Sequence, residues 1–233
     1  MKSLLCKERA RQVLATRGWL ALQNPKLRDA LFEAGQPQLY DPGEYTYHIG
    51  DDLGGIFGVV EGSFGVMGQN PASGIVMGHI YRAGSWFGEG PMAVGARRML
   101  EFRAMEPSVV LQIPLAALDR MQKRDPGIRN QLMTLVAFNS AILIRALSDL
   151  LIRRADQRIA AVLLRVTGAD GHDGPYVPNP VQVTQSDLAE LSNCSRHTVN
   201  ATLKKFEQES WLEVGYGTLN VISPDALRRY LEQ

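Results

Sequence analysis

The chain has 233 residues, of which 45% are hydrophobic and 21% charged, and its formal net charge is +1. This composition excludes intrinsic disorder, which requires low hydrophobicity and high net charge, and the length allows one large domain or two small ones. A near-neutral chain has no overall field to steer it onto nucleic acid or a membrane, so binding to either must be argued from local features.

Cysteine usage and the N-terminal residues predict a soluble protein of the reducing cytoplasm. Cys6 and Cys194 are too few and too far apart for a disulfide framework or an iron–sulfur cluster. Residues 1–9 contain charges before an apolar core can form, so they do not resemble a signal peptide. The longest uncharged apolar-rich run, 130–144, is shorter than the ~18 residues that a membrane span needs, and we expect no membrane partner.

The first half of the chain predicts a β-structure. Fourteen of the 22 glycines lie between Gly43 and Gly95, interleaved with short apolar runs such as 56–60. Repeated turns between short apolar runs are typical of antiparallel strands in a roll or sandwich. Strand character ends near Pro114.

From Asp125 onward the pattern becomes helical. One stripe recurs at spacings of three and four, as on the face of a long helix, and it consists of Leu132, Leu135, Asn139, Ile142, Ala146 and Leu150. The stripe is wide enough to pack both on the β-structure and on a symmetry-related helix, so the 128–150 helix predicts a homodimer. Asn139 in this seam would suit a polar pair that sets the register of the two helices.

The C-terminal part predicts a winged helix-turn-helix. A helical run, 156–166, is followed by a loop, 168–180, with three glycines and three prolines. Helices are then expected at 184–191 and 195–208, with a hairpin around 215–217. Two helices joined by a short polar turn and followed by a hairpin describe this motif.

Capping residues and apolar spacing predict which face of the second helix is exposed. Thr184 and Ser195 suit the N-caps of the two helices, and Asp187 occupies the capping-box position. Val199, Leu203 and Phe206 would form the buried stripe of the second helix, which leaves a polar face for base edges. On that face we expect Arg196 to read guanine and His197 and Asn200 to read neighbouring bases, with Ala201 and Lys204 beside them. Candidate phosphate contacts are Thr184, Gln185, Ser195 and Thr198.

Charge leaves an alternative open. Residues 181–233 contain five Lys and Arg against seven Asp and Glu, a net charge of −2. A sensor module whose helical tail docks a protein instead of DNA would have a similar composition. An enzyme is disfavoured because the sequence contains no nucleophile–base pair and no clustered metal ligands, so no catalytic or metal-binding residue is predicted.

Residues 183–200, with 203–207 after them, resemble the helix-turn-helix of the Crp/Fnr family of bacterial transcription regulators. Turns at 41–44, 58–65 and 84–89 are similar to those of the family's cyclic-nucleotide-binding β-roll, so the resemblance covers nearly the whole chain. It implies an α+β fold with an effector-binding β-roll, a long dimerisation helix and a winged helix-turn-helix. The implied bounds are 1–125, 126–154 and 155–233.

The resemblance also implies a function. The protein would bind a pseudo-palindromic operator on double-stranded DNA as a homodimer and contact RNA polymerase, with the 168–180 loop as a candidate contact. Arg196 matches the arginine that family members place against guanine. His197 stands where many members have glutamate, and Ala201 where some have a second arginine, which implies a different operator sequence.

For the effector pocket, the resemblance places Gly88 and Glu89 at a ribose and Arg98, or its neighbour Arg97, at a phosphate. Two expected polar contacts are missing, because Met99 follows the arginine and the long helix presents apolar residues, Leu143 and Ile144. These losses count against cyclic AMP, and another small ligand or none are the alternatives. Without a ligand, Glu89 and Arg98 would form an internal ion pair or a solvated loop. No cofactor is assigned, since Cys6 alone cannot hold an iron–sulfur cluster.

Overall fold

The computed structural model describes residues 2–90, 92, 95–172 and 174–233. Its contacts divide the chain into two compact units. The first comprises Met1–Gln69 and Ile80–Ala141, and the second comprises Asn70–His79 and Ile142–Gln233. The long helix α6 and the hairpin of β3 and β4 therefore contribute residues to both units.

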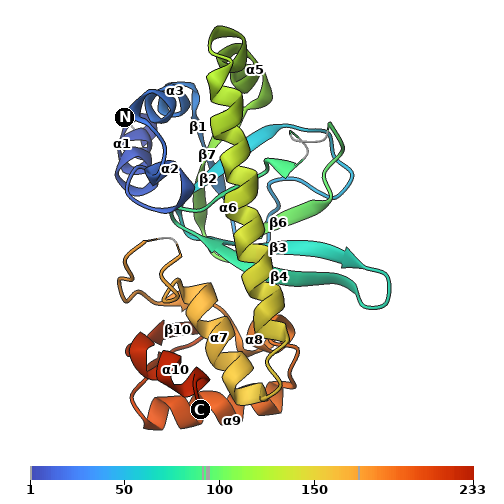
Figure 1. The fold of residues 1–233 in the computed structure, drawn as a ribbon, viewed down its shortest axis with the longest axis vertical. Helices are drawn as coiled ribbons and strands as arrows, with labels where there is room; N and C mark the ends of the chain where they lie inside the picture. Colours follow the sequence, from blue (N-terminus) through green and yellow to red (C-terminus); the bar gives the residue numbers. More distant parts are fainter. Residues whose placement is uncertain (1, 91, 93–94, 173) are drawn as a thin grey trace. The chain divides into compact units, whose positions relative to one another are not determined.

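Two antiparallel sheets form a β-roll (Figure 1). One has the strand order β1-β7-β2-β5 and the other the order β4-β3-β6. The strands are β1 (Gln36–Tyr40), β2 (Gly55–Glu61), β3 (Ser63–Asn70), β4 (Gly74–Arg82), β5 (Trp86–Phe87), β6 (Leu100–Ala104) and β7 (Ser108–Pro114). The predicted end of strand character near Pro114 is confirmed, because β7 ends at that residue.

Some glycines of this region lie inside strands, not in the turns that their abundance suggests. Gly58 lies within β2, where a Cβ atom would come within 2.8 Å of the Trp86 ring. The buried Trp86 packs edge-to-face against Trp19, with ring centroids 5.7 Å apart. Gly58 therefore serves a close approach between the strand and an indole ring.

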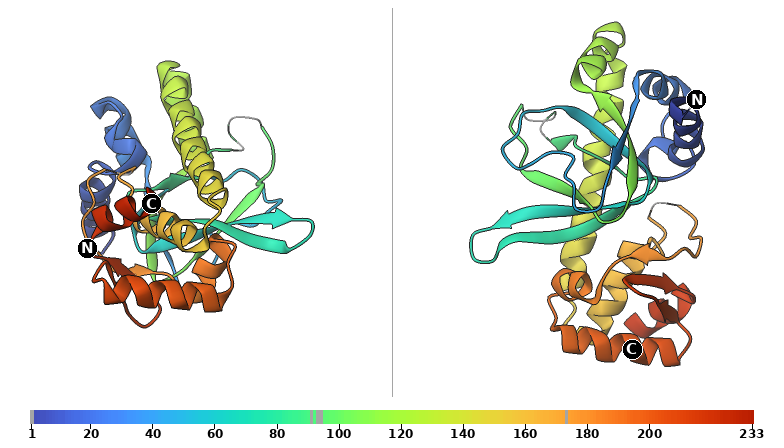
Figure 2. Two further views of the ribbon diagram at one scale, coloured as in Figure 1. Left: turned by 60° about the horizontal axis from the view of Figure 1, so that its bottom comes forward. Right: turned by 180° about the vertical axis from the view of Figure 1, so that it is seen from behind.

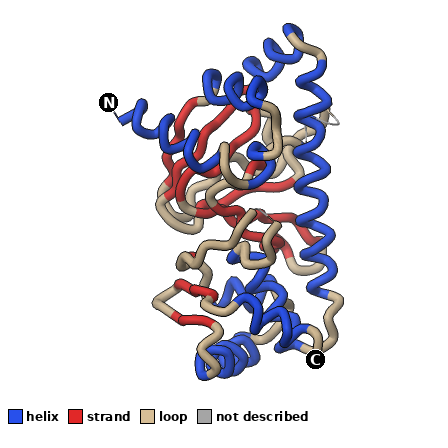
Figure 3. Tube along the Cα trace, turned by 60° about the vertical axis from the view of Figure 1, so that its left-hand side comes forward, coloured by secondary structure: helices blue, strands red, loops and turns tan. Residues whose placement is uncertain are grey.

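Three N-terminal helices, which the sequence analysis does not predict, lie against the strands of the roll (Figure 3). They are α1 (Lys2–Leu14), α2 (Gly18–Ala21) and α3 (Pro25–Ala34). Trp19, Leu27 and Leu31 are almost completely buried. The Trp19 indole also donates a hydrogen bond to the Thr134 hydroxyl of α6 at 2.7 Å, which ties these helices to the long helix.

The predicted long helix is confirmed as α6 (Gly127–Leu150), which follows α5 (Leu115–Arg124). The stripe is buried at Leu132, Leu135, Asn139 and Ile142, but Leu150 is exposed. The prediction that Asn139 pairs with a partner helix is wrong. Its side chain is buried and donates to the Trp86 carbonyl at 3.0 Å and to the Glu89 carboxylate at 2.8 Å, because the roll of the same chain offers acceptors there.

By length and composition alone, α6 would also be long and apolar enough to cross a membrane. The helix is longer than the uncharged run 130–144, because Arg129, Arg145 and Asp149 also lie within it. A single helix of this kind is weak evidence, because the core helix of a soluble protein passes the same test. The Asn139 hydrogen bonds show that one side of α6 packs on protein.

The second unit contains four helices among its described residues besides the end of α6, with a small antiparallel sheet of order β8-β10-β9. Figure 2 shows α9 on the outside of this unit. The elements are α7 (Ala155–Thr167), β8 (Val181–Gln182), α8 (Gln185–Leu191), α9 (Arg196–Gln208), β9 (Leu212–Val214), β10 (Thr218–Val221) and α10 (Pro224–Leu231). The two predicted helices and the hairpin are confirmed, while α10 is not predicted from the sequence.

Candidate nucleic-acid interface and effector site

Both helices of the helix-turn-helix begin at the predicted caps. The Thr184 hydroxyl accepts a hydrogen bond from the Asp187 amide at 3.1 Å, and the Asp187 carboxylate accepts one from the Thr184 amide at 2.8 Å, which completes a capping box. The Ser195 hydroxyl accepts from the Thr198 amide at 3.1 Å. These caps satisfy amides that a helix start leaves without partners, so they fix where α8 and α9 begin.

The turn between the two helices is bound to α7. Asn193 has a left-handed backbone with φ 48°, a conformation that asparagine tolerates better than most residues. Arg158 of α7 donates to the carbonyl of Ser192 at 2.6 Å and to that of Asn193 at 3.4 Å. The orientation of α9 therefore follows that of α7.

The polar face of α9 is exposed as the sequence predicts. Val199, Leu203 and Phe206 are buried, and Phe206 stacks on Trp211 with ring centroids 5.3 Å apart. On the opposite face Arg196, His197, Ala201 and Lys204 are exposed, and Asn200 is half-buried. Lys205 points elsewhere, since its ammonium group donates to the Tyr230 hydroxyl at 2.7 Å.

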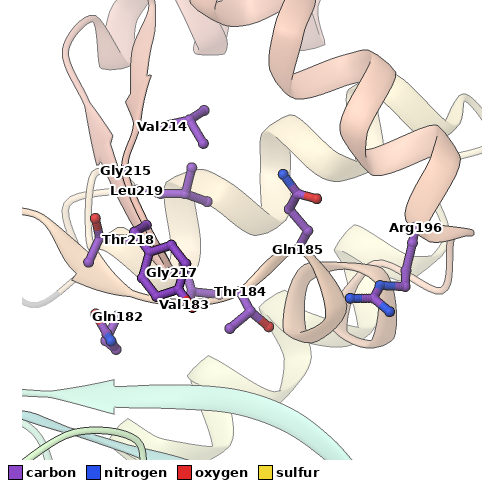
Figure 4. Close-up of a pocket in the computed structure, with 11 residues that line it drawn as sticks. Gln182, Val183, Thr184, Gln185, Arg196, Val214, Gly215, Gly217, Thr218 and Leu219 are labelled. Atoms are coloured by element: carbon purple, nitrogen blue, oxygen red, sulfur yellow. The ribbon is translucent and has the colours of Figure 1, made fainter.

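A groove of about 460 Å³ lies between the start of α9 and the β9–β10 hairpin. Figure 4 shows Thr184, Gln185 and Arg196 on one side of it and the strands of the hairpin on the other. The groove therefore brings together three of the predicted contact residues, whereas Ser195, His197, Thr198, Asn200 and Lys204 are not among its lining residues.

The hairpin contributes groove residues that the sequence analysis missed. Tyr216 at its tip is fully exposed, and it lies between two glycines, the second of which has a positive φ of 69°. Gln182 and Thr218 add polar side chains to the same groove. The sequence does contain a signal for this site, a tyrosine between two glycines at a hairpin tip. Because an aromatic residue there is not needed for burial, it indicates a binding role.

The Asp156 carboxylate belongs to a hydrogen-bonded cluster that connects helices of the second unit. Burial would raise the pKa of Asp156, but hydrogen bonds from Arg154 and the Tyr230 hydroxyl outweigh it and lower that pKa to about 2. Because Tyr230 also accepts from Lys205 of α9, this cluster connects α7, α9 and α10.

Three of the predicted effector residues lie together in the first unit. Arg98 is buried and donates to the carbonyl of Gly88 at 2.6 Å and to that of Gly55 at 2.8 Å. Its guanidinium carbon also lies 3.8 Å from the centroid of the Tyr47 ring, a cation–π contact. Burial lowers the pKa of Arg98.

Glu89 is held by the long helix. Its carboxylate accepts the hydrogen bond from Asn139, and burial raises its pKa although that hydrogen bond lowers it. Glu89 and Arg98 thus each have partners of their own within the chain, Asn139 for the carboxylate and two backbone carbonyls for the guanidinium.

The other predicted effector residues are exposed. Arg97 lies near Asp52, with 3.7 Å between their charged atoms, and Met99 is exposed. Leu143 and Ile144 are exposed on the part of α6 that belongs to the second unit. Among the described residues, no three His, Cys, Asp or Glu side chains are grouped to hold a metal ion. The side chain of Cys6 lies outside the described part of the structure.

Two known domain families match the chain over the regions just described. Residues 157–230 match the Crp-like helix-turn-helix domain, and residues 37–125 match the cyclic nucleotide-binding domain. The chain belongs to the Crp/Fnr family of transcription regulators. It is a DNA-binding transcription regulator of this type and not an enzyme, and the predicted α+β fold is confirmed.

Relatives and solved structures agree with this assignment. The chain is 22% identical over 200 residues to the HTH-type transcriptional regulator Cmr of Mycobacterium tuberculosis, covering 85% of this chain and 78% of Cmr. It is 22% identical over 206 residues to the fumarate and nitrate reduction regulatory protein of Salmonella typhimurium, covering 85% and 79%.

Solved structures share the fold of this Crp/Fnr regulator. FixK2 from Bradyrhizobium japonicum superposes with a TM-score of 0.70 at 16% identity, covering 84% of this chain and 96% of FixK2. A CRP/FNR-family regulator from Thermus thermophilus superposes with a TM-score of 0.63 at 19% identity, covering 85% and 99%. Because the sequence identities are only 16% and 19%, the similarity to these two structures establishes the fold and nothing about function.

Proposed function

We propose that this regulator binds a pseudo-palindromic operator as a homodimer, with the start of each α9 in the major groove of one half-site. The exposed polar face at the capped start of α9 carries the proposal, because a recognition helix reads base edges with its N-terminal residues. Two such helices in one dimer would reach half-sites roughly one helical turn apart.

The proposed contacts divide into base readout and phosphate binding. Arg196 donates two hydrogen bonds to the O6 and N7 atoms of a guanine, and His197 and Asn200 contact the neighbouring bases. Lys204, one turn further along the exposed face, lies beside the same groove of the DNA. The phosphate contacts are Thr184, Gln185, Ser195 and Thr198, of which Gln185 has no role in the caps described above.

Exposed apolar residues on α6 support the homodimer. Leu143, Ile144, Leu147 and Leu150 are between 43% and 63% exposed, although each is large and apolar. Contiguous apolar surface of this kind marks an interaction site. A second copy of α6 would cover it, as the wide apolar stripe predicts.

We also propose that DNA binding does not require cyclic AMP. Arg98, the candidate phosphate ligand, directs its two terminal nitrogens at carbonyls of its own chain, and Glu89, the candidate ribose ligand, is held by Asn139. Met99, Leu143 and Ile144 add no polar group for the nucleotide. By its family, the protein would act in the bacterial cytoplasm, where RNA polymerase would be its partner through the 168–180 loop.

The test is selection of randomised duplex DNA by the purified protein, with and without cyclic AMP. We expect one palindrome to be enriched equally in both. Enrichment only with the nucleotide would refute ligand-independent binding. No enrichment in either, together with no binding of any duplex at low salt, would favour a tail that docks a protein.

A further inference from the structure

The connection between α6 and α7 is short and is crossed by two ion pairs. Helix α6 ends at Leu150 and α7 begins at Ala155, so only residues 151–154 join them. Arg165 of α7 pairs with Asp149 of α6 at 2.7 Å. Arg145 of α6 pairs with Asp170, just beyond α7, at 3.0 Å. All four charged residues belong to the second compact unit.

The two pairs differ in burial. The side chains of Arg165 and Asp149 are 4% and 15% exposed, whereas those of Arg145 and Asp170 are 44% and 22% exposed. An ion pair near the surface is screened by water and holds its partners weakly. Separating a buried pair leaves each charge uncompensated. The Arg165–Asp149 pair therefore opposes separation of α6 and α7 more strongly than the Arg145–Asp170 pair does.

Arg165 also reaches a third element. It donates to the Nδ1 atom of His79 at 2.8 Å and to the Gly78 carbonyl at 3.4 Å, both in the part of β4 that belongs to this unit. His79 is 4% exposed. One guanidinium group therefore joins the end of α6, the last turn of α7 and the strand β4, and a planar group with donors along two edges suits that task.

The position of α7 determines the position of the recognition helix. Helix α7 packs on both α8 and α9, and Arg158 binds the turn between them. In this structure the Arg165–Asp149 pair is formed, and Arg196, His197 and Lys204 are exposed. The pair therefore does not cover the DNA-binding face, and it fixes that face relative to the end of α6.

We propose that Asp149 and Arg165 are positioning residues for DNA binding, whose ion pair holds the recognition helix at a set orientation to the dimerisation helix. The inference rests on the proposed function, because it concerns two half-sites bound by one homodimer. A dimer with both recognition helices held at a fixed separation loses less conformational freedom on binding a palindrome. It also discriminates between half-site spacings, since a misplaced half-site cannot be reached.

The test compares Asp149→Asn with the wild type on three duplexes: the palindrome enriched by selection, the same palindrome with one scrambled half-site, and one with an extra base pair between half-sites. We expect the variant to bind the intact palindrome about 10-fold more weakly and the single half-site equally well. The extra base pair should weaken the wild type about 10-fold and the variant less than about 3-fold.

Two further variants distinguish loss of this ion pair from a folding defect and from loss of any nearby ion pair. The double variant Asp149→Asn with Arg165→Gln contains no unpaired buried charge, so it should fold if Asp149→Asn does not, and it should show the same loss of spacing discrimination. Asp170→Asn removes the more exposed pair, while its amide oxygen can still accept from the His172 amide, so this variant should bind all three duplexes as the wild type does.

Equal losses on the palindrome and the single half-site would overturn the positioning role, because a merely structural defect weakens both. Unchanged binding and unchanged spacing discrimination would overturn it too. A wild type that prefers the palindrome no more than random DNA would instead refute the proposed function itself.

Discussion

Replacement of Arg196 is the most direct test of how this regulator reads DNA. Arg196 is the first residue of α9 and is exposed, and the Ser195–Thr198 cap that starts the helix does not involve its side chain. Arg196→Ala should therefore change the free energy of unfolding by less than about 0.5 kcal/mol. The expected loss lies in binding alone.

The size of that loss follows from the contact. A bidentate arginine–guanine pair is worth about 1–3 kcal/mol of discrimination, which is roughly 5- to 150-fold in affinity for each half-site. A homodimer makes the contact twice, so the free-energy loss on the full palindrome is about twice that on one half-site, provided that the two sites are independent.

The assay is equilibrium binding to the selected palindrome, to the same duplex with the guanine replaced, and to random DNA. Arg196→Ala should lose its preference between the first two. Arg196→Lys keeps the charge but not the two-pronged geometry, so it should keep its affinity for random DNA and lose the same preference. Lys204→Ala should weaken specific and random binding by similar factors. Equal loss by Arg196→Ala on specific and random DNA would refute the assignment of Arg196 to a base.

Three further predictions concern the hairpin, the cap and the effector site. Tyr216→Ala should lower operator affinity about fivefold (~1 kcal/mol) without changing the thermal midpoint, while Tyr216→Phe should bind nearly as the wild type does; binding titrations and melting curves check both. Ser195→Ala should cost about 1 kcal/mol of stability in denaturant unfolding, because the Thr198 amide loses its acceptor. Burial raises the pKa of Glu89, so its contribution to stability is greatest below the pKa of the unfolded chain and is lost as pH rises through the higher folded value. Glu89→Gln should therefore raise the melting temperature at pH 7 and leave it unchanged near pH 4; a rise of equal size at both pH values would contradict this.

The helix-turn-helix could be predicted well because its signals are local. Thr184 and Asp187 are three residues apart and bond to each other, so the sequence contains the whole capping box. The buried stripe of α9 likewise depends only on helical spacing. Local agreement between caps, spacing and turn residues specifies such a motif without knowledge of the rest of the fold.

Features that depend on distant residues could not be predicted. Helical spacing places Asn139 on the buried face of α6, but its partner Glu89 lies 50 residues earlier, and nothing near Asn139 identifies that partner. The packing of the N-terminal helices could not be predicted for the same reason, since Trp19 is buried against Trp86, a distant residue of the roll. The pairing of Arg165 with Asp149 and His79 also joins three separate elements.

The net charge of −2 that residues 181–233 contribute to the second unit, which leaves a protein-docking tail open as an alternative, has a structural explanation. Several of its acidic side chains accept hydrogen bonds inside the unit: Asp187 from the Thr184 amide, Glu190 from the Met77 amide and Glu207 from the Val214 amide. Arg196 and Lys204, in contrast, are exposed on the face of α9 that we propose contacts DNA. Because exposed charges beyond about 10 Å are screened at physiological salt, DNA at this face responds to the nearby cations more than to the net charge of the unit. A face with few cations makes few phosphate contacts, so affinity for random DNA should be low. Selectivity between DNA sequences should then depend on Arg196 and on the β9–β10 hairpin.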